Sequence, residues 1–271
     1  MIDLVINLSA RVLYLILFFF SIALFCKGET FYRHEELRAS CDLPKKCRSF
    51  SEDRIFGSGQ FSLCELQSFL LKYSDRRVVI VDLRREFHGF IEGNPVSWKL
   101  EPGAYKEGSF QYNKGISAGT LQKEEKEFLR KNDAISEKEL IDGLSLNLSY
   151  VRIPILDHSF PKEAEVDAFL ALMQTLSMSD RIYFHCAGGK GRTTVAMCMA
   201  DIFYNCHLFT VEEILQRQND LGGSNLLVER LEGGRLLFLT FFYKYCLENR
   251  TLIESWSSWI KRQEGAFLLR D

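Results

Sequence analysis

The spacing of hydrophobic positions along the chain predicts an α/β fold. Three short, almost continuously apolar runs predict buried strands, at residues 77–83, 150–155 and 181–184. Five longer segments have helical character, because they show an apolar face at offsets of three and four, a charge-rich pattern or a fully apolar pattern. They are residues 121–141, 161–178, 193–203, 211–218 and 235–247. Strands and helices that alternate in this way indicate a parallel sheet with helices on both faces.

An apolar run near the N-terminus stands apart from this pattern. Residues 12–26 are fifteen apolar or small residues, fewer than the roughly 20 that a membrane-spanning helix needs. We therefore expect residues 1–28 to be a signal peptide cleaved after Gly28, with the mature domain at 29–271, and a periplasmic or secreted protein. An uncleaved membrane anchor and a lipoprotein modified at Cys26 are the alternatives, and contact with a membrane is expected only if the segment is retained.

The cysteines and the net charge limit the remaining possibilities. Of the eight cysteines, removal of Cys26 with the signal peptide would leave seven, an odd number, and cysteines scattered over a domain of this size do not resemble a disulfide scaffold. Cys41 and Cys47 could pair. Cys198 and Cys206 fall in an apolar helical stretch and are expected in the core. A formal net charge of −2 argues against bulk electrostatic binding of nucleic acid, so an anionic substrate would require a local cluster of positive charge.

The sequence HCAGGKGRT, at residues 185–193, is the strongest chemical signal in the chain. It joins a predicted strand to a predicted helix, where glycines allow backbone N–H groups to converge on an anion and the helix N-terminus adds positive potential. This field favours the thiolate of Cys186 as a nucleophile, Arg192 can hold two phosphoryl oxygens, and Thr193 can hydrogen-bond the sulfur. The backbone that would bind phosphate belongs to Ala187, Gly188, Gly189, Lys190 and Gly191. A structural cysteine beside a glycine-rich turn is the alternative, and the combination of His185, Arg192 and Thr193 disfavours it.

A phosphatase with a cysteine nucleophile also needs a general acid. Asp157 is the candidate, because it follows the predicted strand at 150–155 and lies 29 residues before Cys186. The alternative is that Asp157 caps the helix that starts near Pro161. His158 is either a phosphate ligand or a solvated loop histidine.

Several blocks of sequence resemble one family, the protein-tyrosine-phosphatase-like phytases of bacteria. They are HCAGGKGRT and YVRIPILDHSFP, supported by VDLRREFHGFIEGNPVSW, NKG, LPKKCRS, GSGQFS and WSSWIK, and together they span most of residues 41–262. The resemblance implies a phosphatase α/β domain with a small β-rich insertion, for which the glycine-rich stretch near 84–119 is the natural place. It implies hydrolysis of phosphomonoesters of myo-inositol polyphosphates through a phosphocysteine, without a metal or other cofactor. It also implies that Arg48 and His158 bind inositol phosphates.

Two positions depart from the family pattern. Cys47 stands where the family tends to have an aromatic residue, and Lys190 stands where an apolar residue is common. Phosphoinositide phosphatases related to tensin have lysine at the position of Lys190, which here would add positive charge beside the nucleophile. A phosphoinositide or phosphotyrosine phosphatase is therefore the alternative enzyme. A phosphate-binding protein without activity is disfavoured, because nucleophile, arginine and acid are all present.

Overall fold

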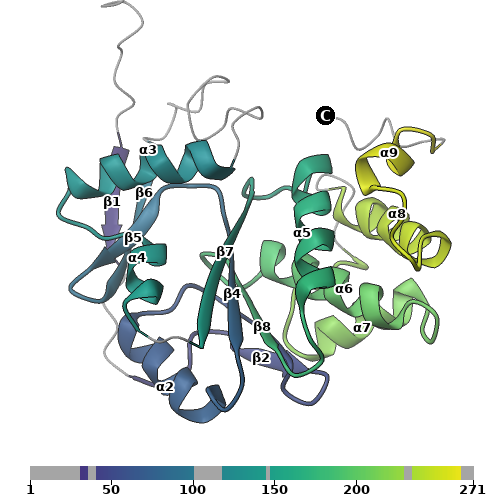
Figure 1. The fold of residues 1–271 in the computed structure, drawn as a ribbon, viewed down its shortest axis with the longest axis horizontal. Helices are drawn as coiled ribbons and strands as arrows, with labels where there is room; N and C mark the ends of the chain where they lie inside the picture. Colours follow the sequence, from purple (N-terminus) through teal and green to yellow (C-terminus); the bar gives the residue numbers. More distant parts are fainter. Residues whose placement is uncertain (1–30, 36–40, 101–117, 145–146, 229–233, 264–271) are drawn as a thin grey trace, which may run out of the picture.

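The computed structural model describes residues 31–35, 41–100, 118–144, 147–228 and 234–263 (Figure 1). The expected signal peptide or anchor at 1–28 lies outside these residues. In the part of the chain that the structure describes, no helix is long and apolar enough to cross a membrane.

A five-stranded, mostly parallel sheet forms the centre of the molecule. Its strands are, in spatial order, β2 (Arg48–Phe50), β3 (Ile55–Ser58), β8 (Arg181–His185), β4 (Val78–Arg84) and β7 (Leu148–Ile155). The last four are parallel to one another, whereas β2 is antiparallel to β3 at the edge. Only four residues join β2 to β3, too few for the crossover that a parallel pair requires. The predicted fold class is confirmed, with this antiparallel edge strand as an addition.

Helices cover both faces of the sheet, because the side chains of a strand alternate between them. Val78 and Ile80 of β4 pack with α2 (Leu63–Tyr73) and α4 (Glu137–Asp142). Val79 and Val81 pack on the other face. The helices on that side are α5 (Glu163–Thr175), α6 (Gly191–Asn205), α7 (Val211–Asp220), α8 (Arg235–Glu248) and α9 (Trp256–Ile260). Figure 1 shows these two groups of helices on opposite sides of the strands.

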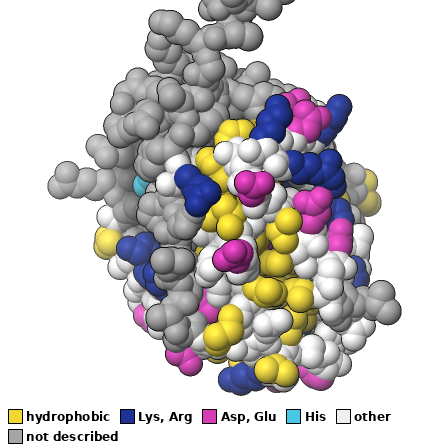
Figure 2. Space-filling model, turned by 90° about the vertical axis from the view of Figure 1, so that its left-hand side faces the viewer, with side chains coloured by type: hydrophobic (Ala, Val, Ile, Leu, Met, Phe, Trp, Pro, Cys, Tyr) yellow, Lys and Arg dark blue, Asp and Glu magenta, His cyan; other side chains and the backbone are white. Residues whose placement is uncertain are grey.

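A small antiparallel sheet lies beside the main one. It consists of β1 (Phe31–Glu35), β6 (Asn94–Leu100) and β5 (His88–Ile91), in that spatial order. Helix α3 (Ala118–Arg130) contributes Leu121 and Leu129 to a separate hydrophobic cluster with Trp98 of β6. The small sheet supplies the predicted β-rich element; of the stretch near 84–119, residues 101–117 lie outside the described part. On the face seen in Figure 2, the described acidic and basic side chains are interspersed around hydrophobic ones.

Two local features differ from the sequence prediction. The helix expected at 121–141 is divided into α3 and α4, because Asp133 adopts a left-handed conformation and Ser136 begins α4 with a capping box to Glu139. Helix α2 was not predicted, although the same capping signal is present at Ser62 and Glu65.

Cysteine pairing also differs from what was considered. Cys41 forms a disulfide with Cys64, and Cys47 is free. The disulfide joins the segment before β2 to the first turn of α2. Cys198 and Cys206 are buried, so their prediction as core residues is confirmed.

Candidate active site

The HCAGGKGRT loop connects the carboxyl end of β8 to the N-terminus of α6, which is where ligands bind in parallel α/β sheets. The loop packs against the end of β3, since the backbone N–H of Gln60 donates to the carbonyl of Ala187 at 3.1 Å. Gly189 has φ +67°, and a Cβ there would lie 2.4 Å from the backbone nitrogen of Gly59. Only glycine satisfies both the conformation and the close approach, so this position fixes the loop against β3.

Cys186 lies inside the loop and is only 4% exposed. Thr193 Oγ1 lies 3.1 Å from Cys186 Sγ and 3.0 Å from the carbonyl oxygen of Ser58. Its single hydroxyl group can therefore donate a hydrogen bond either to the sulfur or to the carbonyl oxygen. The loop glycines and the N-terminus of α6 surround the sulfur with positive backbone potential, as a nucleophilic thiolate requires.

Arg192 is buried and oriented by Glu86. Its Nη1 and Nη2 donate to the two carboxylate oxygens at 2.7 and 2.9 Å, and Nη1 also lies 3.2 Å from the carbonyl of Ile155. Burial alone would raise the pKa of Glu86, but the charges of Arg192 and Arg84 outweigh it and hold the pKa well below its ordinary value. Glu86 was not nominated from the sequence, where it is one charged residue among several after β4.

Asp157 follows the end of β7 and reaches the same pocket. Its Oδ1 lies 3.2 Å from Arg192 Nη2 and accepts the backbone N–H of His158 at 3.0 Å. The side chain is 56% exposed, so it can exchange protons with a bound substrate or with water. The capping alternative is wrong, because Lys162 is the N-cap of α5.

Cys186, Arg192 and Asp157 line one open pocket of about 300 Å³. Its lining residues are Asp157, His158, Cys186, Ala187, Gly188, Lys190, Gly191, Arg192, Ser224 and Arg235. The structure thus brings together the loop and the acid segment that were nominated from sequence, and His158 extends its side chain, 94% exposed, at the mouth. Among the described residues, no group of His, Cys, Asp and Glu side chains is arranged to hold a metal ion.

Arg235 lines the pocket but had no distinguishing sequence signal. It is the first residue of α8, and its Nε donates to the carbonyl of Ser159 at 3.2 Å. Its guanidinium packs against the loop so closely that a Cβ on Gly191 would lie 2.8 Å from Arg235 Nη2. Arg235 therefore connects α8, the acid segment and the loop.

Arg48 does not line the pocket. It is buried beneath the loop, where Nη1 donates to the carbonyl of Gly189 at 2.9 Å and Nη2 donates to Thr194 Oγ1 at 3.1 Å. The expected role of Arg48 as a direct ligand of inositol phosphate does not fit this position, because these donors face the loop from below. The geometry instead makes Arg48 a support for the loop.

His185 is oriented from behind by a buried network. Its Nε2 lies 2.7 Å from Glu137 Oε1, and Glu137 Oε2 lies 3.5 Å from Nε2 of His88, which is 3.2 Å from Asp82. Burial would raise the pKa of Glu137, but the charge of His185 outweighs it and the pKa falls to about 2. Burial would lower the pKa of His88, but the charge of Asp82 outweighs it and the pKa rises to about 9. The network links the loop to the small sheet.

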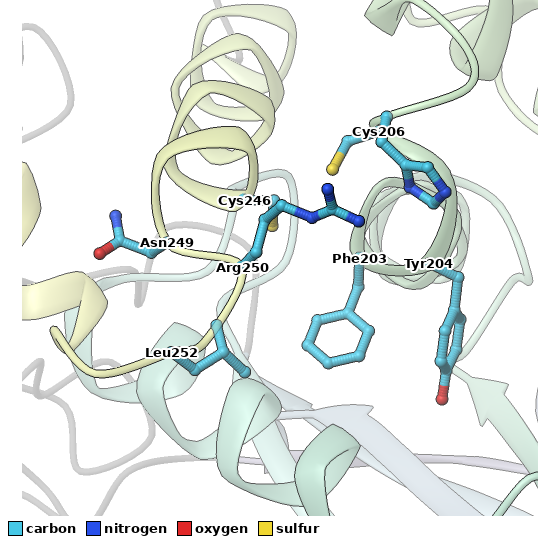
Figure 3. A pocket seen from close by; sticks show the side chains of 8 residues that line it. Phe203, Tyr204, Cys206, Cys246, Asn249, Arg250 and Leu252 are labelled. Atoms are coloured by element: carbon cyan, nitrogen blue, oxygen red, sulfur yellow. The ribbon is translucent and has the colours of Figure 1, made fainter.

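A second pocket lies at the opposite end of α6. It is lined by Phe203, Tyr204, Cys206, His207, Cys246, Asn249, Arg250 and Leu252, and Figure 3 shows Arg250 extending across it toward Cys206. The fifteen residues of α6 span roughly 22 Å at 1.5 Å per residue, so this pocket is remote from Cys186. Its lining includes two cysteines and an arginine but no carboxylate, so it lacks the complete set of nucleophile, arginine and acid that lines the first pocket.

Comparison with known proteins finds one matching family model and several relatives. The family model of protein-tyrosine-phosphatase-like phytases, described as "Inositol hexakisphosphate", matches residues 113–204. The effector protein hopD2 of Pseudomonas syringae pv. tomato is 24% identical over 268 residues, which cover 85% of this chain and 56% of that protein.

Two solved structures share the fold. The protein-tyrosine-phosphatase-like myo-inositol phosphatase of Mitsuokella multacida, in complex with myo-inositol-(1,3,4,5)-tetrakisphosphate, superimposes with a TM-score of 0.74 at 24% identity, covering 86% of this chain and 48% of that one. The protein-tyrosine-phosphatase-like phytase of Bdellovibrio bacteriovorus gives a TM-score of 0.73 at 23% identity, covering 86% and 95%. The chain thus spans about half the length of hopD2 and of the Mitsuokella protein.

Proposed function

This chain belongs, through residues 113–204, to the protein-tyrosine-phosphatase-like phytases, and on that basis we propose that it is a cysteine-dependent phosphatase of myo-inositol polyphosphates. One observation carries the proposal: Cys186 and Arg192 of the loop and Asp157 of the segment after β7 line one pocket. A thiol, a bidentate phosphate ligand and an exposed acid are the three groups that phosphomonoester hydrolysis through a covalent intermediate requires.

In the first step the Cys186 thiolate attacks phosphorus. A sulfur–phosphorus bond forms while the bond from phosphorus to the inositol oxygen breaks, and Asp157 gives its proton to the departing oxygen. Arg192, held flat by Glu86, and the backbone N–H groups of the loop bind the three non-bridging oxygens as charge shifts onto them.

In the second step water attacks the phosphocysteine. Asp157, now a carboxylate, takes a proton from the water as its oxygen bonds to phosphorus, and the sulfur leaves as a thiolate. Thr193, whose Oγ1 lies 3.1 Å from the sulfur, stabilises that leaving thiolate by donating its hydroxyl proton. Phosphate then leaves the pocket, and Cys186 is ready for another turnover.

The test is phosphate release from three substrates: phytate, a soluble phosphoinositide and a phosphotyrosine peptide. We expect phytate to have the highest kcat/KM, and we expect Cys186→Ser to abolish release while inositol phosphate binding is retained. A clear preference for the phosphotyrosine peptide would replace the proposed substrate. Residual activity of Cys186→Ser above a few per cent of wild type would overturn the mechanism.

We also propose that the protein is exported, with cleavage of the N-terminal segment after Gly28. The disulfide between Cys41 and Cys64 supports this, because such bonds persist in oxidising compartments. N-terminal sequencing of the protein recovered from cell fractions tests the proposal. A cytosolic protein that retains residues 1–28 would contradict it.

A further inference from the structure

Two segments from distant parts of the sequence, each with a lysine, lie side by side at the catalytic loop. Lys190 is the residue before α6 and lines the pocket. Lys46 lies in a tight turn that is closed by a hydrogen bond of 3.0 Å from the N–H of Cys47 to the carbonyl of Pro44. Both lysine side chains are exposed.

Arg48 fixes the distance between the turn and the loop. Its Nη1 donates to the carbonyl of Lys46 at 3.1 Å and to the carbonyl of Gly189 at 2.9 Å, so these two oxygens are at most about 6 Å apart. A second contact holds the turn from the other side, because the N–H of Gly59 donates to the carbonyl of Lys45 at 2.9 Å. Since Gly59 also packs against Gly189, the position of Lys46 relative to Lys190 is built into the fold.

The two ammonium groups lack acidic partners. Within the described part of the chain, neither Lys46 nor Lys190 forms an ion pair with a carboxylate. Slight burial, followed by the charges of Lys190 and Arg48, lowers the pKa of Lys46. Positive charges held together without a counterion repel one another, and a bound anion would relieve that repulsion.

We propose that Lys46 and Lys190 together bind a second, non-scissile phosphate group of the substrate, on the side of the pocket next to the Pro44–Cys47 turn. The inference rests on the proposed function and adds Lys46 to the residues that determine specificity. A monophosphate bound by the loop and Arg192 carries no second phosphate for this pair to bind, whereas an inositol polyphosphate carries several. The pair therefore selects for substrates with more than one phosphate.

The first experiment compares substrates. Lys46→Gln, Lys190→Gln and the double variant are assayed with phytate and with para-nitrophenyl phosphate at low and raised salt. Because exposed phosphate contacts are screened, we expect each single change to lower kcat/KM for phytate, relative to that for the aryl phosphate, by about twofold to fivefold at low salt. Raised salt should reduce this difference. Lys46→Arg should retain the preference for phytate, since it keeps the charge.

The control is Lys131→Gln, which removes an exposed lysine after α3 and should leave both substrates unaffected. An equal loss on both substrates in Lys46→Gln, or no loss on either, would overturn the inference. Soluble phosphoinositides with one and with two ring phosphates distinguish a free inositol phosphate from a lipid headgroup as the source of the second phosphate.

The second experiment separates this inference from the proposed function. Binding of inositol hexakisphosphate to Cys186→Ser is measured by calorimetry, with and without Lys46→Gln. Weaker binding when Lys46→Gln is added to Cys186→Ser supports the lysine pair even if the wild type does not hydrolyse phytate. If the wild type hydrolyses phytate but adding Lys46→Gln to Cys186→Ser leaves binding unchanged, the proposed function is supported and the lysine pair is contradicted.

Discussion

Glu86 accepts hydrogen bonds from both terminal nitrogens of Arg192, at 2.7 and 2.9 Å. The two residues are 106 positions apart: Glu86 follows β4, and Arg192 lies in the first turn of α6. The pair fixes the plane of the guanidinium before substrate arrives, so little side-chain entropy remains to be lost on binding phosphate.

Glu86→Gln tests this pair. The amide keeps the shape of the side chain but removes its charge and one acceptor, leaving a buried arginine incompletely paired. Hydrogen bonds to charged groups contribute about 1.5–3 kcal/mol, so we expect kcat/KM to fall by about tenfold to a hundredfold. The loss should be similar for phytate and para-nitrophenyl phosphate, because both depend on Arg192. Steady-state assays with both substrates measure it, and a loss confined to phytate would refute this role.

Asp157→Asn separates general acid catalysis from structure. Inositol alkoxides are poor leaving groups and need a proton, whereas para-nitrophenolate does not. We therefore expect a fall of about 10²–10⁴-fold in kcat for phytate and a much smaller one for the aryl phosphate. Because the carboxylate is exposed and also lies 3.2 Å from Arg192 Nη2, thermal unfolding of the variant serves as the control. Equal losses on the two substrates would make Asp157 a structural residue.

Arg48→Ala should behave differently from Lys46→Gln. It removes the donors to the carbonyls of Lys46 and Gly189 and to Thr194, and leaving a buried polar group unsatisfied costs about 1–3 kcal/mol. We expect a lower melting temperature and reduced turnover of both phytate and para-nitrophenyl phosphate. Calorimetry and kinetics on the same preparation measure the two effects. Selective loss of phytate with unchanged stability would restore Arg48 as a substrate ligand.

The buried network behind the loop predicts how stability depends on pH. Glu137, with its pKa lowered from 4.5 to about 2, stabilises the fold above pH 4.5 and loses this contribution as the pH falls toward 2. His88, with its pKa raised from 6.5 to about 9, contributes fully below pH 6.5 and loses its contribution as the pH rises through 9. Unfolding free energies from urea titrations should therefore be highest near pH 5–6.5.

Two variants assign the two limbs of that profile. His88→Gln should flatten the decline between pH 6.5 and 9, and Glu137→Gln should flatten the decline below pH 4.5. An unchanged alkaline limb in His88→Gln would mean that another group titrates there.

The main strands and the catalytic segments were predictable because their information is local. A strand buried on both faces reads as a continuous apolar run, as in β4 and β8, and the nine-residue loop contains the nucleophile, glycines and arginine together. Asp157 was found for the same reason, as the first acid after a predicted strand.

The supporting residues could not be assigned from sequence, because their roles depend on contacts between distant positions. Arg48 reaches Gly189 across 141 residues, and nothing in LPKKCRS distinguishes a buried arginine from one that faces solvent. The small sheet was left vague because its strands of four to seven residues give weak periodicity. Helix α2 was missed although its capping signal, Ser62 with Glu65, is local.

The turn at Pro44–Cys47 lies outside residues 113–204, the segment matched by the family model, which contains Cys186, Arg192 and Asp157. The reaction groups and Lys46, one half of the proposed second phosphate contact, therefore lie in different stretches of the chain that are brought together only by folding. A replacement in the turn can change which phosphate esters are preferred while Cys186, Arg192 and Asp157 stay unchanged. Relatives that share the loop can accordingly differ in substrate preference while they keep the same mechanism.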